Sequence, residues 1–459
     1  MPHSVDLVLR SGAIVTPGGL VEADLAISEG RIAAIGPIGE IAAAEEIQIR
    51  GLTVLPGVID TQVHFREPGL THKEDLASGT LAAIKGGVTT IFEMPNTTPP
   101  TTTAEALADK LRRAEGRAWC DHAFFVGATE ENAEELRYLE QLPGCAGVKM
   151  FMGSSTGTLL VGEDEGVEAV LRSGRRRIAV HSEDEARLRE RLALVRDSGD
   201  PALHPVWRDE ETALRATLRL LSLARQCGRP VHVLHVTTAE EMDVLGRNKD
   251  IATVEVTPQH LTLAAPDCYR NLGTLAQMNP PIRDARHRDA LWRAIEEAIV
   301  DCLGSDHAPH SREEKARPYP TSPSGMPGVE TMLPIMLDHV AAGRLSLLRL
   351  VDLTSAGPAR VYGIAAKGRV AVGYDADLTI VDLKLRKTIH AAELASKCGW
   401  TSFEDMSVTG WPVMTVLRGA TVMRDGAPQG YPRGRPARFH DTLAKPAEAL
   451  ARQSIPGQR

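Results

Sequence analysis

The sequence has no surplus of basic residues, and this absence limits the partners that we expect. Its 459 residues carry a formal net charge of −8, and the densest basic run is Arg175 to Arg177. A nucleic-acid backbone is bound by a concentrated positive surface, which this composition does not supply. We therefore expect no nucleic-acid partner.

Cysteine pairs and long apolar runs are also missing. The six cysteines include no C-x-x-C pair, which disfavours a disulfide framework or a thiolate zinc site. No run reaches 18 apolar residues, and the start lacks a basic segment followed by an apolar stretch. We expect a cytoplasmic protein that makes no membrane contact.

The two ends of the chain share one sequence pattern. Short alternating strands with glycine turns fill residues 5–54, and similar strands return after residue 365 in "KGRVAVGYDADLTIVDL". We therefore predict a small β-sandwich domain built from both termini, with its two parts at residues 1–54 and 365–440. A tail at residues 441–459 completes the chain.

The middle, residues 55–364, alternates apolar strands with amphipathic helices. Eight candidate strands end in polar residues: "LPGVIDTQVHF", "VTTIFEMPN", "HAFFVGAT", "GVKMFMG", "RIAVHSED", "PVHVLHVTT", "ATVEVTPQHL" and "IVDCLGSDHAPH". Eight βα units favour an α/β fold of the (β/α)₈ TIM-type barrel class over an open sheet. In such a barrel, active sites lie where these polar endings meet.

The polar residues at these endings include several types that bind divalent metals. One histidine near a strand end is more often structural, but recurrence at the same edge favours a divalent metal site with imidazole and oxygen ligands. The residues concerned are Gln62, His64, Arg66, Asn96, Lys149, His181, His235, Asp306 and His310.

Strand periodicity decides which side chains we expect to converge. In "VIDTQVHFREPG" the period of two predicts that Asp60, Gln62, His64 and Arg66 share one face. In "HVLHVTT" two histidines stand three apart, so a regular strand directs only one of them into the barrel. We choose His235 and expect the other, at position 232, to pack against the outer helices.

Lys149 and Asp306 have chemical and structural interpretations. Lys149 lies among apolar residues, where an ammonium is costly, so it either extends to solvent, pairs with a carboxylate, or is a neutral amine that captures carbon dioxide as a carbamate bridging two metals. Asp306 is either a turn residue or an oxygen ligand that also carries protons. Arg66, Asn96 and Asn279, together with His310, would bind an anionic oxygen or carboxylate.

The strand-end segments also resemble a known family. The motifs "PGVIDTQVHFREPG", "EMPNTTP", "KMFMGSSTG", "VHSED", "LHVTT", "VTPQHL", "MNPPIRD", "GSDHAPH" and "SGMPGVET" are similar, in order, to those of class I dihydroorotases of the amidohydrolase superfamily. The resemblance runs from about Asp6 to Gly430. It implies a barrel with a flanking β-sandwich, a zinc centre, and the reversible cyclisation of N-carbamoyl-L-aspartate to L-dihydroorotate in pyrimidine synthesis.

The resemblance also implies roles for single residues. Metal ligands fall on His64, Lys149 in carboxylated form, His181, His235 and Asp306, and carboxylate-binding residues fall on Arg66, Asn96 and His310, with Asn279 near the pyrimidine ring. The "SGMPGVE" motif favours a substrate-contacting loop over a variable surface loop at residues 311–328.

Two positions depart from the family pattern. Gln62 replaces the first histidine of the H-x-H pair, and Gln259 stands where a histidine is common. An amide oxygen binds zinc less well than imidazole does. We therefore expect one firmly bound Zn²⁺ and a second position that is weak or empty.

The same residues are also compatible with other functions. A dihydropyrimidinase, hydantoinase or allantoinase would use the same centre on another cyclic amide, but the pair Arg66 and Asn96 favours dihydroorotate. Loss of a histidine at Gln62 would suit a non-catalytic scaffold for aspartate transcarbamoylase, but the other ligand candidates remain. We expect a homodimer, with association with aspartate transcarbamoylase as a further partner hypothesis.

Overall fold

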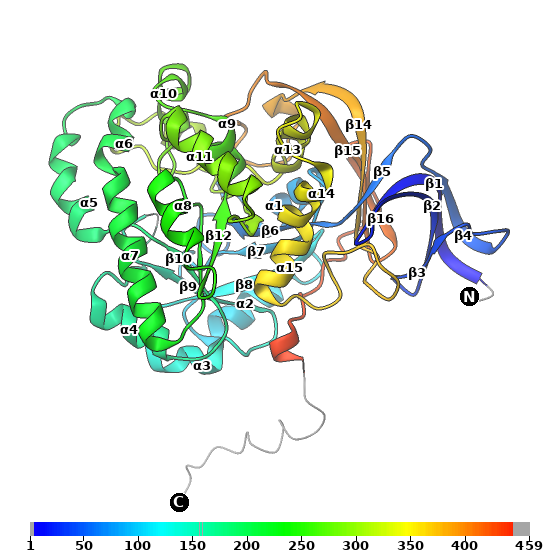
Figure 1. Cartoon of the computed structure of the whole chain (residues 1–459), viewed down its shortest axis with the longest axis horizontal. Helices are drawn as coiled ribbons and strands as arrows, with labels where there is room; N and C mark the ends of the chain where they lie inside the picture. The colour runs from blue at the N-terminus through cyan, green and yellow to red at the C-terminus, as the bar shows by residue number, and fades with distance from the viewer. Residues whose placement is uncertain (1–3, 156, 158, 444–459) are drawn as a thin grey trace, which may run out of the picture.

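The computed structural model describes residues 4–155, 157 and 159–443, so most of the expected tail lies outside the described residues. The larger part of the molecule is an eight-stranded parallel sheet wrapped by helices (Figure 1). Its strand order is β13-β12-β11-β10-β9-β8-β7-β6, so each strand pairs with its neighbour in the sequence. The strands are β6 (Val58–Val63), β7 (Val88–Glu93), β8 (Asp121–Gly127), β9 (Cys145–Phe151), β10 (Ile178–His181), β11 (Val231–Val233), β12 (Ala252–Val256) and β13 (Cys302–Leu303).

The first and last strands meet and close the barrel. A parallel bridge joins Val63 to His307, and the backbone N–H of His64 donates to the His307 carbonyl at 2.7 Å. All eight predicted strands are therefore present, and the predicted (β/α)₈ fold is confirmed.

The helices form because apolar residues recur on one face and polar side chains cap their ends. In α7 the Asp209 side chain accepts from the Thr212 N–H, and Gly228 ends the helix in the left-handed conformation. The helices around the barrel are α1 (Leu76–Lys85), α2 (Ala104–Ala114), α3 (Leu136–Leu139), α4 (Asp164–Arg172), α5 (Glu185–Arg191), α6 (His204–Trp207), α7 (Glu210–Cys227), α8 (Ala239–Gly246), α9 (Pro258–Thr262), α10 (Asp267–Leu272), α11 (Ala285–Glu296), α12 (Arg312–Lys315), α13 (Met332–Ala341), α14 (Leu347–Val351) and α15 (Gly357–Tyr362). None of the described helices is long and apolar enough to span a bilayer.

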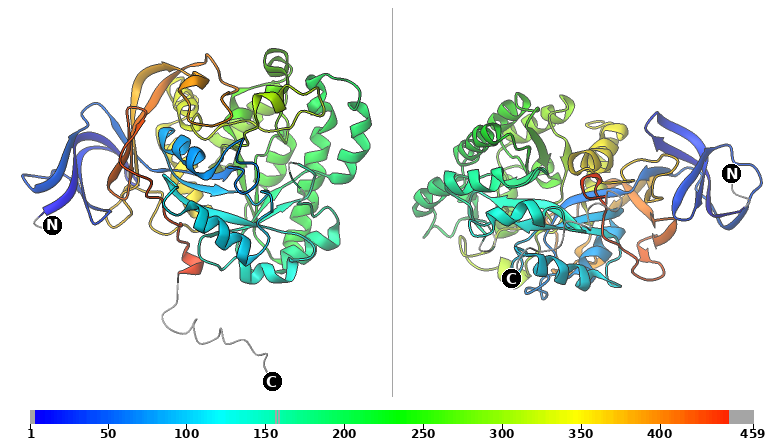
Figure 2. Two further views of the ribbon diagram at one scale, coloured as in Figure 1. Left: turned by 180° about the vertical axis from the view of Figure 1, so that it is seen from behind. Right: turned by 90° about the horizontal axis from the view of Figure 1, so that it is seen from below.

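A second sheet of nine strands flanks the barrel and combines both ends of the chain (Figure 2). Its order is β17-β16-β15-β14-β5-β1-β2-β3, with β4 also pairing β1. The antiparallel pair β5 and β14 joins the two halves. Its strands are β1 (Ser4–Thr16), β2 (Gly19–Ser28), β3 (Arg31–Gly36), β4 (Ala42–Gln48), β5 (Thr53–Pro56), β14 (Leu378–Thr388), β15 (Ser407–Leu417), β16 (Ala420–Arg424) and β17 (Ala427–Pro428). The predicted flanking β domain from both termini is thus present, while the domain limits at residues 54, 364 and 440 remain predictions.

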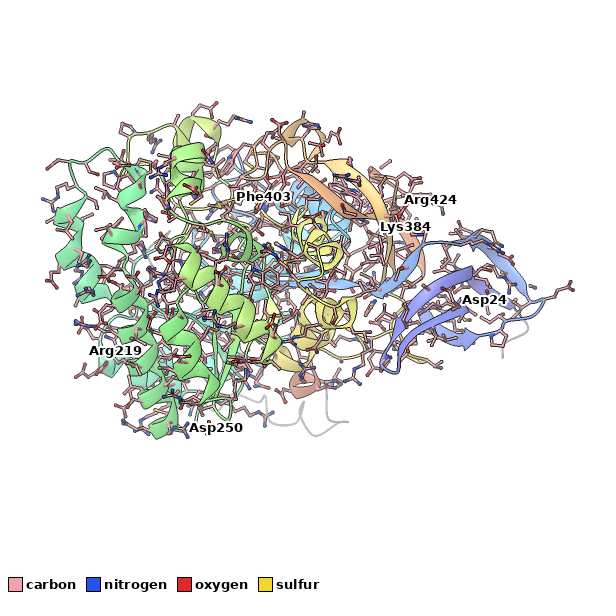
Figure 3. The ribbon with its side chains drawn as sticks, turned by 45° about the horizontal axis from the view of Figure 1, so that its top comes forward. Asp24, Arg219, Asp250, Lys384, Phe403 and Arg424 are labelled. Carbon is pink, nitrogen blue, oxygen red and sulfur yellow. The ribbon has the colours of Figure 1, made fainter. Side chains whose placement is uncertain are left out.

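Charged side chains join the two parts. Lys367 is buried between Asp121 at the start of β8, at 2.7 Å, and Asp377 just before β14. Charged residues on the outer faces are more accessible, among them Lys384 on β14 and Asp250 beyond α8 (Figure 3).

Aromatic side chains pack together inside the barrel. The Phe92 ring lies 6.1 Å from Phe125 and 5.3 Å from Tyr362, centroid to centroid, and Phe439 packs against the same group. This aromatic group fills one part of the barrel interior, whereas the candidate functional residues lie toward the carboxyl ends of the strands.

Candidate active site

A small pocket lies at the carboxyl ends of the barrel strands, and most of the residues singled out from the sequence line it. They are Gln62, His64, Lys149, His181, His235, Asn279 and Asp306, joined by Phe151, Ser155, Ala308, Ser324 and Gly325. Residues from five different strand ends and from three loops thus face one small volume.

His64 and Asp306 form one half of the pocket. The Nδ1 of His64 donates to the Asn96 amide oxygen at 2.8 Å, which leaves the Nε2 lone pair facing Asp306 Oδ1 at 3.3 Å. Metal-binding histidines commonly donate their other ring N–H to an oxygen in this way. The amide nitrogen of Gln62 donates to the same Asp306 oxygen at 3.0 Å, and the Gln62 amide oxygen is buried without a hydrogen-bond partner among the described residues.

His181 and His235 form the other half. The Nδ1 of His181 lies 3.0 Å from Nε2 of His235, and the Nε2 of His181 lies 2.7 Å from the Glu183 carboxylate. Burial opposes ionisation of Glu183, but Arg208, whose Nε donates to it at 3.0 Å, and His181 lower its pKa well below the usual value. Glu183 is therefore a carboxylate that accepts the His181 Nε2–H, and the Nδ1 lone pair faces the pocket.

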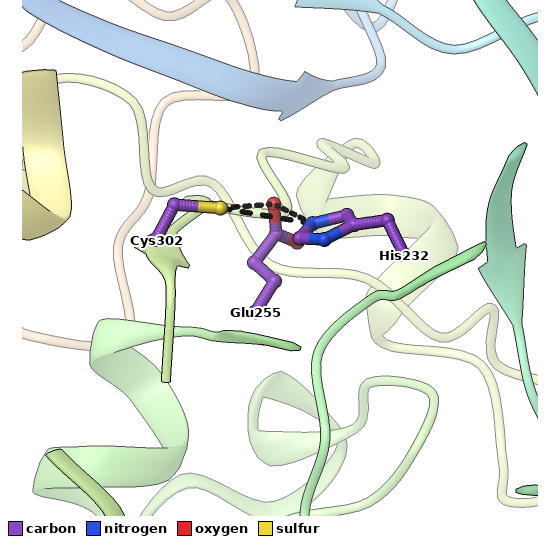
Figure 4. A group of neighbouring side chains, drawn as sticks. All are labelled: His232, Glu255 and Cys302. Carbon is purple, nitrogen blue, oxygen red and sulfur yellow. Dashed lines mark hydrogen bonds and ion pairs between the residues drawn. The ribbon is translucent and has the colours of Figure 1, made fainter. Parts of the chain in front are cut away.

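The expectation that His232 packs against the outer helices is wrong. Strand β11 ends at Val233, and His235 has a φ of 37°, so the period of two does not extend from one histidine to the other. His232 pairs in register with Ala179, whose side chain belongs to the barrel interior, and it lies beside Glu255 and Cys302 (Figure 4). Both histidines therefore face inward.

The expectation that four alternating residues share one strand face is also wrong. Strand β6 ends at Val63, its pairing with β7 shifts register between Asp60 and Val63, and Arg66 has a φ of 63°. The Asp60 carboxylate accepts backbone N–H groups of Ser305 and Gln62 at 3.0 and 3.2 Å. Asp60 therefore holds the backbone at two strand ends through its carboxylate. Arg66 lies beyond the end of β6 and is positioned by its left-handed backbone conformation.

Lys149 is buried on β9 and its Nζ has no hydrogen-bond partner in the described part of the chain. It lies 4.4 Å from the centroid of the Phe151 ring. Burial lowers the pKa of Lys149 to about 7, although Asp306 and Glu255 act in the opposite direction. Of the three interpretations, extension to solvent is excluded because the side chain is 1% exposed, and no carboxylate of the described residues is within ion-pair distance. The remaining interpretation is a neutral amine. With a pKa of about 7, a substantial fraction of the Lys149 side chain is uncharged near pH 7.

Beside the pocket, Arg66 and His310 form a positive cluster with Lys73. Arg66 Nε donates to the Pro309 carbonyl at 3.1 Å, and its Nη2 lies 3.2 Å from His310 Nε2. Lys73 Nζ lies 3.1 Å from His310 Nδ1 and 3.0 Å from Glu314. Burial, and then the nearby cations, lower the pKa of His310 well below its usual value, so this ring is neutral.

Arg66 is buried and forms no ion pair with the described residues. Its side chain is only 2% exposed, and among the described residues no carboxylate oxygen lies within 4.0 Å of its guanidinium. A buried guanidinium normally pairs with an anion. Lys73, the other buried cation here, was not foreseen, because nothing in "THKED" separates it from a surface lysine.

Loops complete the pocket wall. Ser324 and Gly325 come from the segment 311–328, which therefore contacts the site. Lys315 holds this segment in place by donating to the carbonyls of Gln277 and Gly325 at 3.1 and 3.2 Å. This lysine and Ser155, another lining residue, lacked a distinguishing pattern in the sequence.

Asn279 and Gln259 take different places. Asn279 lines the pocket, with its amide oxygen 3.0 Å from His204 Nε2 and its amide nitrogen 3.4 Å from Ser155 Oγ. Gln259 donates to the Ser305 carbonyl at 2.8 Å, directly before Asp306 in the chain. Gln259 therefore supports the backbone that carries Asp306.

Known proteins are similar to this chain over most of its length. The model of the amidohydrolase family matches residues 53–422. A dihydroorotase of Methanothermobacter thermautotrophicus is 35% identical over 88% of this chain and 91% of its own, and one of Halobacterium salinarum is 38% identical over 87% and 93%.

Among solved structures, an L-hydantoinase (dihydropyrimidinase) from Arthrobacter aurescens superposes with a TM-score of 0.89 at 30% identity, covering 95% of this chain and 100% of that one. Proteins named for two different activities are therefore similar to this chain over most of its length. The family model covers most of the chain and the relatives align over nearly all of it, so the chain belongs to the amidohydrolase family.

Proposed function

We propose that this protein is a dihydroorotase, which reversibly cyclises N-carbamoyl-L-aspartate to L-dihydroorotate in de novo pyrimidine synthesis. The two archaeal relatives that bear this name support the activity. The structural observation that carries the proposal is the buried Arg66 guanidinium without a carboxylate partner beside the pocket. Both substrates carry a carboxylate that survives the reaction, and Arg66 is placed to receive it.

The donor set fits a divalent metal such as zinc. The His181 and His235 nitrogens lie 3.0 Å apart, close to the separation of two ligands on one ion, and the second nitrogen of His181 donates to a carboxylate. These two residues and one oxygen of a Lys149 carbamate would hold the firm position. His64 and Asp306, with the other carbamate oxygen, would hold the weaker one, where Gln62 adds at most an amide oxygen. When bound, zinc supplies a Lewis acid and lowers the pKa of a water to near neutrality.

Lys149 is suited to become the carbamate. Its uncharged amine would bond to the carbon of carbon dioxide and release one proton, which leaves a carbamate with one negative charge. This needs a neutral amine, and burial supplies one by lowering the pKa of Lys149 to about 7. An ammonium without a partner at this position would be destabilised.

Asp306 is the proton carrier of the proposal. In the hydrolytic direction it accepts the proton of the attacking water and delivers it to the ring nitrogen that leaves, and in synthesis it performs the reverse. Its carboxylate is held by Gln62 and lies next to His64, so its orientation is set before the substrate arrives.

Arg66, Asn96 and His310 would bind the substrate carboxylate, and Asn279 would lie near the ring. The neutral His310 adds no charge between Arg66 and Lys73, and Glu314 is the one carboxylate among the described residues that forms an ion pair with these two cations, which favours an anionic substrate. We further propose that the enzyme acts in the cytoplasm as a homodimer, that it associates with aspartate transcarbamoylase, and that its domain limits are those predicted above.

A hydantoinase or dihydropyrimidinase activity is the second candidate, since the L-hydantoinase structure superposes over almost the whole chain. A non-catalytic scaffold is disfavoured because the other proposed ligands besides Gln62 line the pocket together. The two catalytic candidates differ in the need for Arg66, because hydantoin and dihydrouracil carry no carboxylate.

Turnover of L-dihydroorotate, hydantoin, dihydrouracil and allantoin by the purified metal-loaded protein tests the proposal. We expect kcat/KM for dihydroorotate to exceed the others by at least about 10²-fold, because a site built to bind a polar group rejects analogues that lack it. Faster turnover of hydantoin or dihydrouracil would replace dihydroorotase with the second candidate. Absence of turnover on all four would support a scaffold.

A further inference from the structure

A second cluster of metal-binding side chains lies inside the barrel, below the pocket. His232 on β11, Glu255 on β12 and Cys302 on β13 come from three adjacent strands, and each is fully buried at 0% exposure (Figure 4). His232 pairs with Ala179, two residues before His181, so the cluster lies about 7 Å below the pocket histidines along the strand direction. It shares no residue with the proposed active site.

Two of the three distances within the cluster match those between ligands of one tetrahedral ion, and the third is slightly longer. His232 Nε2 lies 3.6 Å from Glu255 Oε2 and 3.6 Å from Cys302 Sγ, and Sγ lies 3.9 Å from Oε2. Tetrahedral zinc with ordinary bond lengths separates nitrogen, oxygen and sulfur ligands by about 3.4–3.6 Å. The contact between His232 and Glu255 is too long for a normal hydrogen bond, so direct pairing does not explain it.

The tautomer of His232 directs a lone pair into the cluster. Its Nδ1 lies 2.8 Å from the Thr253 hydroxyl, and that hydroxyl donates to the Val231 carbonyl at 3.4 Å. The hydroxyl therefore accepts from Nδ1–H, and Nε2 of the neutral ring is unprotonated. A histidine that donates one N–H to an oxygen and presents the other nitrogen is the usual arrangement of a metal ligand.

Two buried oxygens beside the cluster lack partners. Glu255 Oε1 and the hydroxyl of Tyr362 make no hydrogen bond in the described part of the chain. The Tyr362 ring packs edge-on against His232, with centroids 5.5 Å apart, and the Thr61 hydroxyl holds the other Glu255 oxygen at 2.8 Å. An unpaired buried carboxylate oxygen is costly, and a cation bound at this carboxylate would lower that cost.

We propose that His232, Glu255 and Cys302 form a buried site for a borderline divalent cation such as Zn²⁺ or Co²⁺, separate from the catalytic centre. Binding replaces the protons of the Cys302 thiol and the Glu255 carboxyl, so the thiolate, carboxylate, neutral imidazole and dication sum to zero charge. A neutral cluster suits this apolar interior better than isolated ions do. Since all three ligands are fully buried, the ion enters as the barrel folds.

Cobalt reports on this site separately from the active site, because no cysteine lines the pocket and only a thiolate gives a near-ultraviolet sulfur-to-cobalt charge-transfer band. The full-length protein would be produced in medium with Co²⁺ as the added transition metal. We expect the band in the wild-type protein and one sulfur in the cobalt shell by X-ray absorption. Absence of both would overturn the proposal without any variant.

Three variants sharpen the test. Cys302→Ser, close in size, should abolish the band and lower cobalt content by up to one ion per chain. Cys145→Ser, which changes a fully buried cysteine on β9, should leave band and content unchanged. His235→Ala should lower cobalt content and keep the band, which separates this site from the proposed catalytic centre. A band that persists in Cys302→Ser, or disappears in His235→Ala, contradicts the proposal, whatever the activity on dihydroorotate.

Discussion

The amide nitrogen of Gln62 lies 3.0 Å from a carboxylate oxygen of Asp306. The nitrogen must face this oxygen, because the amide oxygen would be repelled by it, and the amide oxygen is left buried without a partner. The residue that replaces the first histidine therefore orients the proposed proton carrier. In the proposed metal centre it would stand at a ligand position, and in this structure it acts as a hydrogen-bond donor.

Replacing Gln62 by histidine should fill the weaker metal position. Imidazole binds zinc better than an amide does, so Gln62→His is expected to raise zinc content by up to one ion per chain, measured by plasma mass spectrometry after dialysis. Gln62→Leu, which removes both amide atoms, is the control and should not raise it. Unchanged metal content in a folded Gln62→His protein would show that the glutamine does not limit occupancy.

Removing the charge of Asp306 should slow turnover with little effect on binding. For Asp306→Asn we expect kcat to fall by about 10²- to 10⁴-fold, the range of general acid–base catalysis. Binding of N-carbamoyl-L-aspartate, measured by calorimetry on zinc-loaded protein, should change far less, since Arg66 remains. Near wild-type kcat would assign the proton transfer to another group.

Glu183 should matter for metal affinity although it contacts no proposed metal position. It accepts the ring N–H of His181 and is held by Arg208. Glu183→Gln weakens this support and is expected to lower zinc affinity about 10- to 100-fold, measured by competition with a chelator. Glu190→Gln, at an exposed position on the helix α5 that follows Glu183, is the matched control. Equal affinities in the two variants would remove Glu183 from the metal centre.

Arg66 should control the choice of substrate. Loss of a charge-assisted hydrogen bond costs about 1.5–3 kcal/mol, so Arg66→Met is expected to raise KM for dihydroorotate by roughly 10- to 100-fold. Arg317→Met changes an exposed arginine of the neighbouring loop and should have no such effect. If Arg66→Met leaves KM unchanged, the substrate carboxylate binds elsewhere.

Lys367 should stabilise the junction of the barrel and the flanking sheet. Its removal leaves Asp121 and Asp377 buried with one cation fewer, so Lys367→Met should lower the free energy of unfolding by about 3–5 kcal/mol. Lys384→Met, at an exposed position of β14, should change it by less than about 0.5 kcal/mol. Denaturant titration of both proteins provides the comparison, and similar losses would contradict the assigned role.

The strand ends show how far periodicity predicts a site. All eight strands and the closed barrel followed from alternating apolar segments, because parallel strands must bury both faces. The same rule failed at His232 and Arg66, where a left-handed residue or an early strand end breaks the period of two. Strand propensity does not reveal such local breaks, since long-range contacts decide them.

The sequence by itself determined the succession of eight barrel strands, the contribution of both termini to one flanking β domain and the residue types available at the strand ends. Only the tertiary structure decided which nitrogen of His181 faces the pocket, that the Lys149 amine has no hydrogen-bond partner among the described residues, and that Gln62 donates to Asp306. The physical reason is that hydrogen-bond direction, tautomer and charge balance depend on partners far away in the chain. Closure of the barrel brings those partners together.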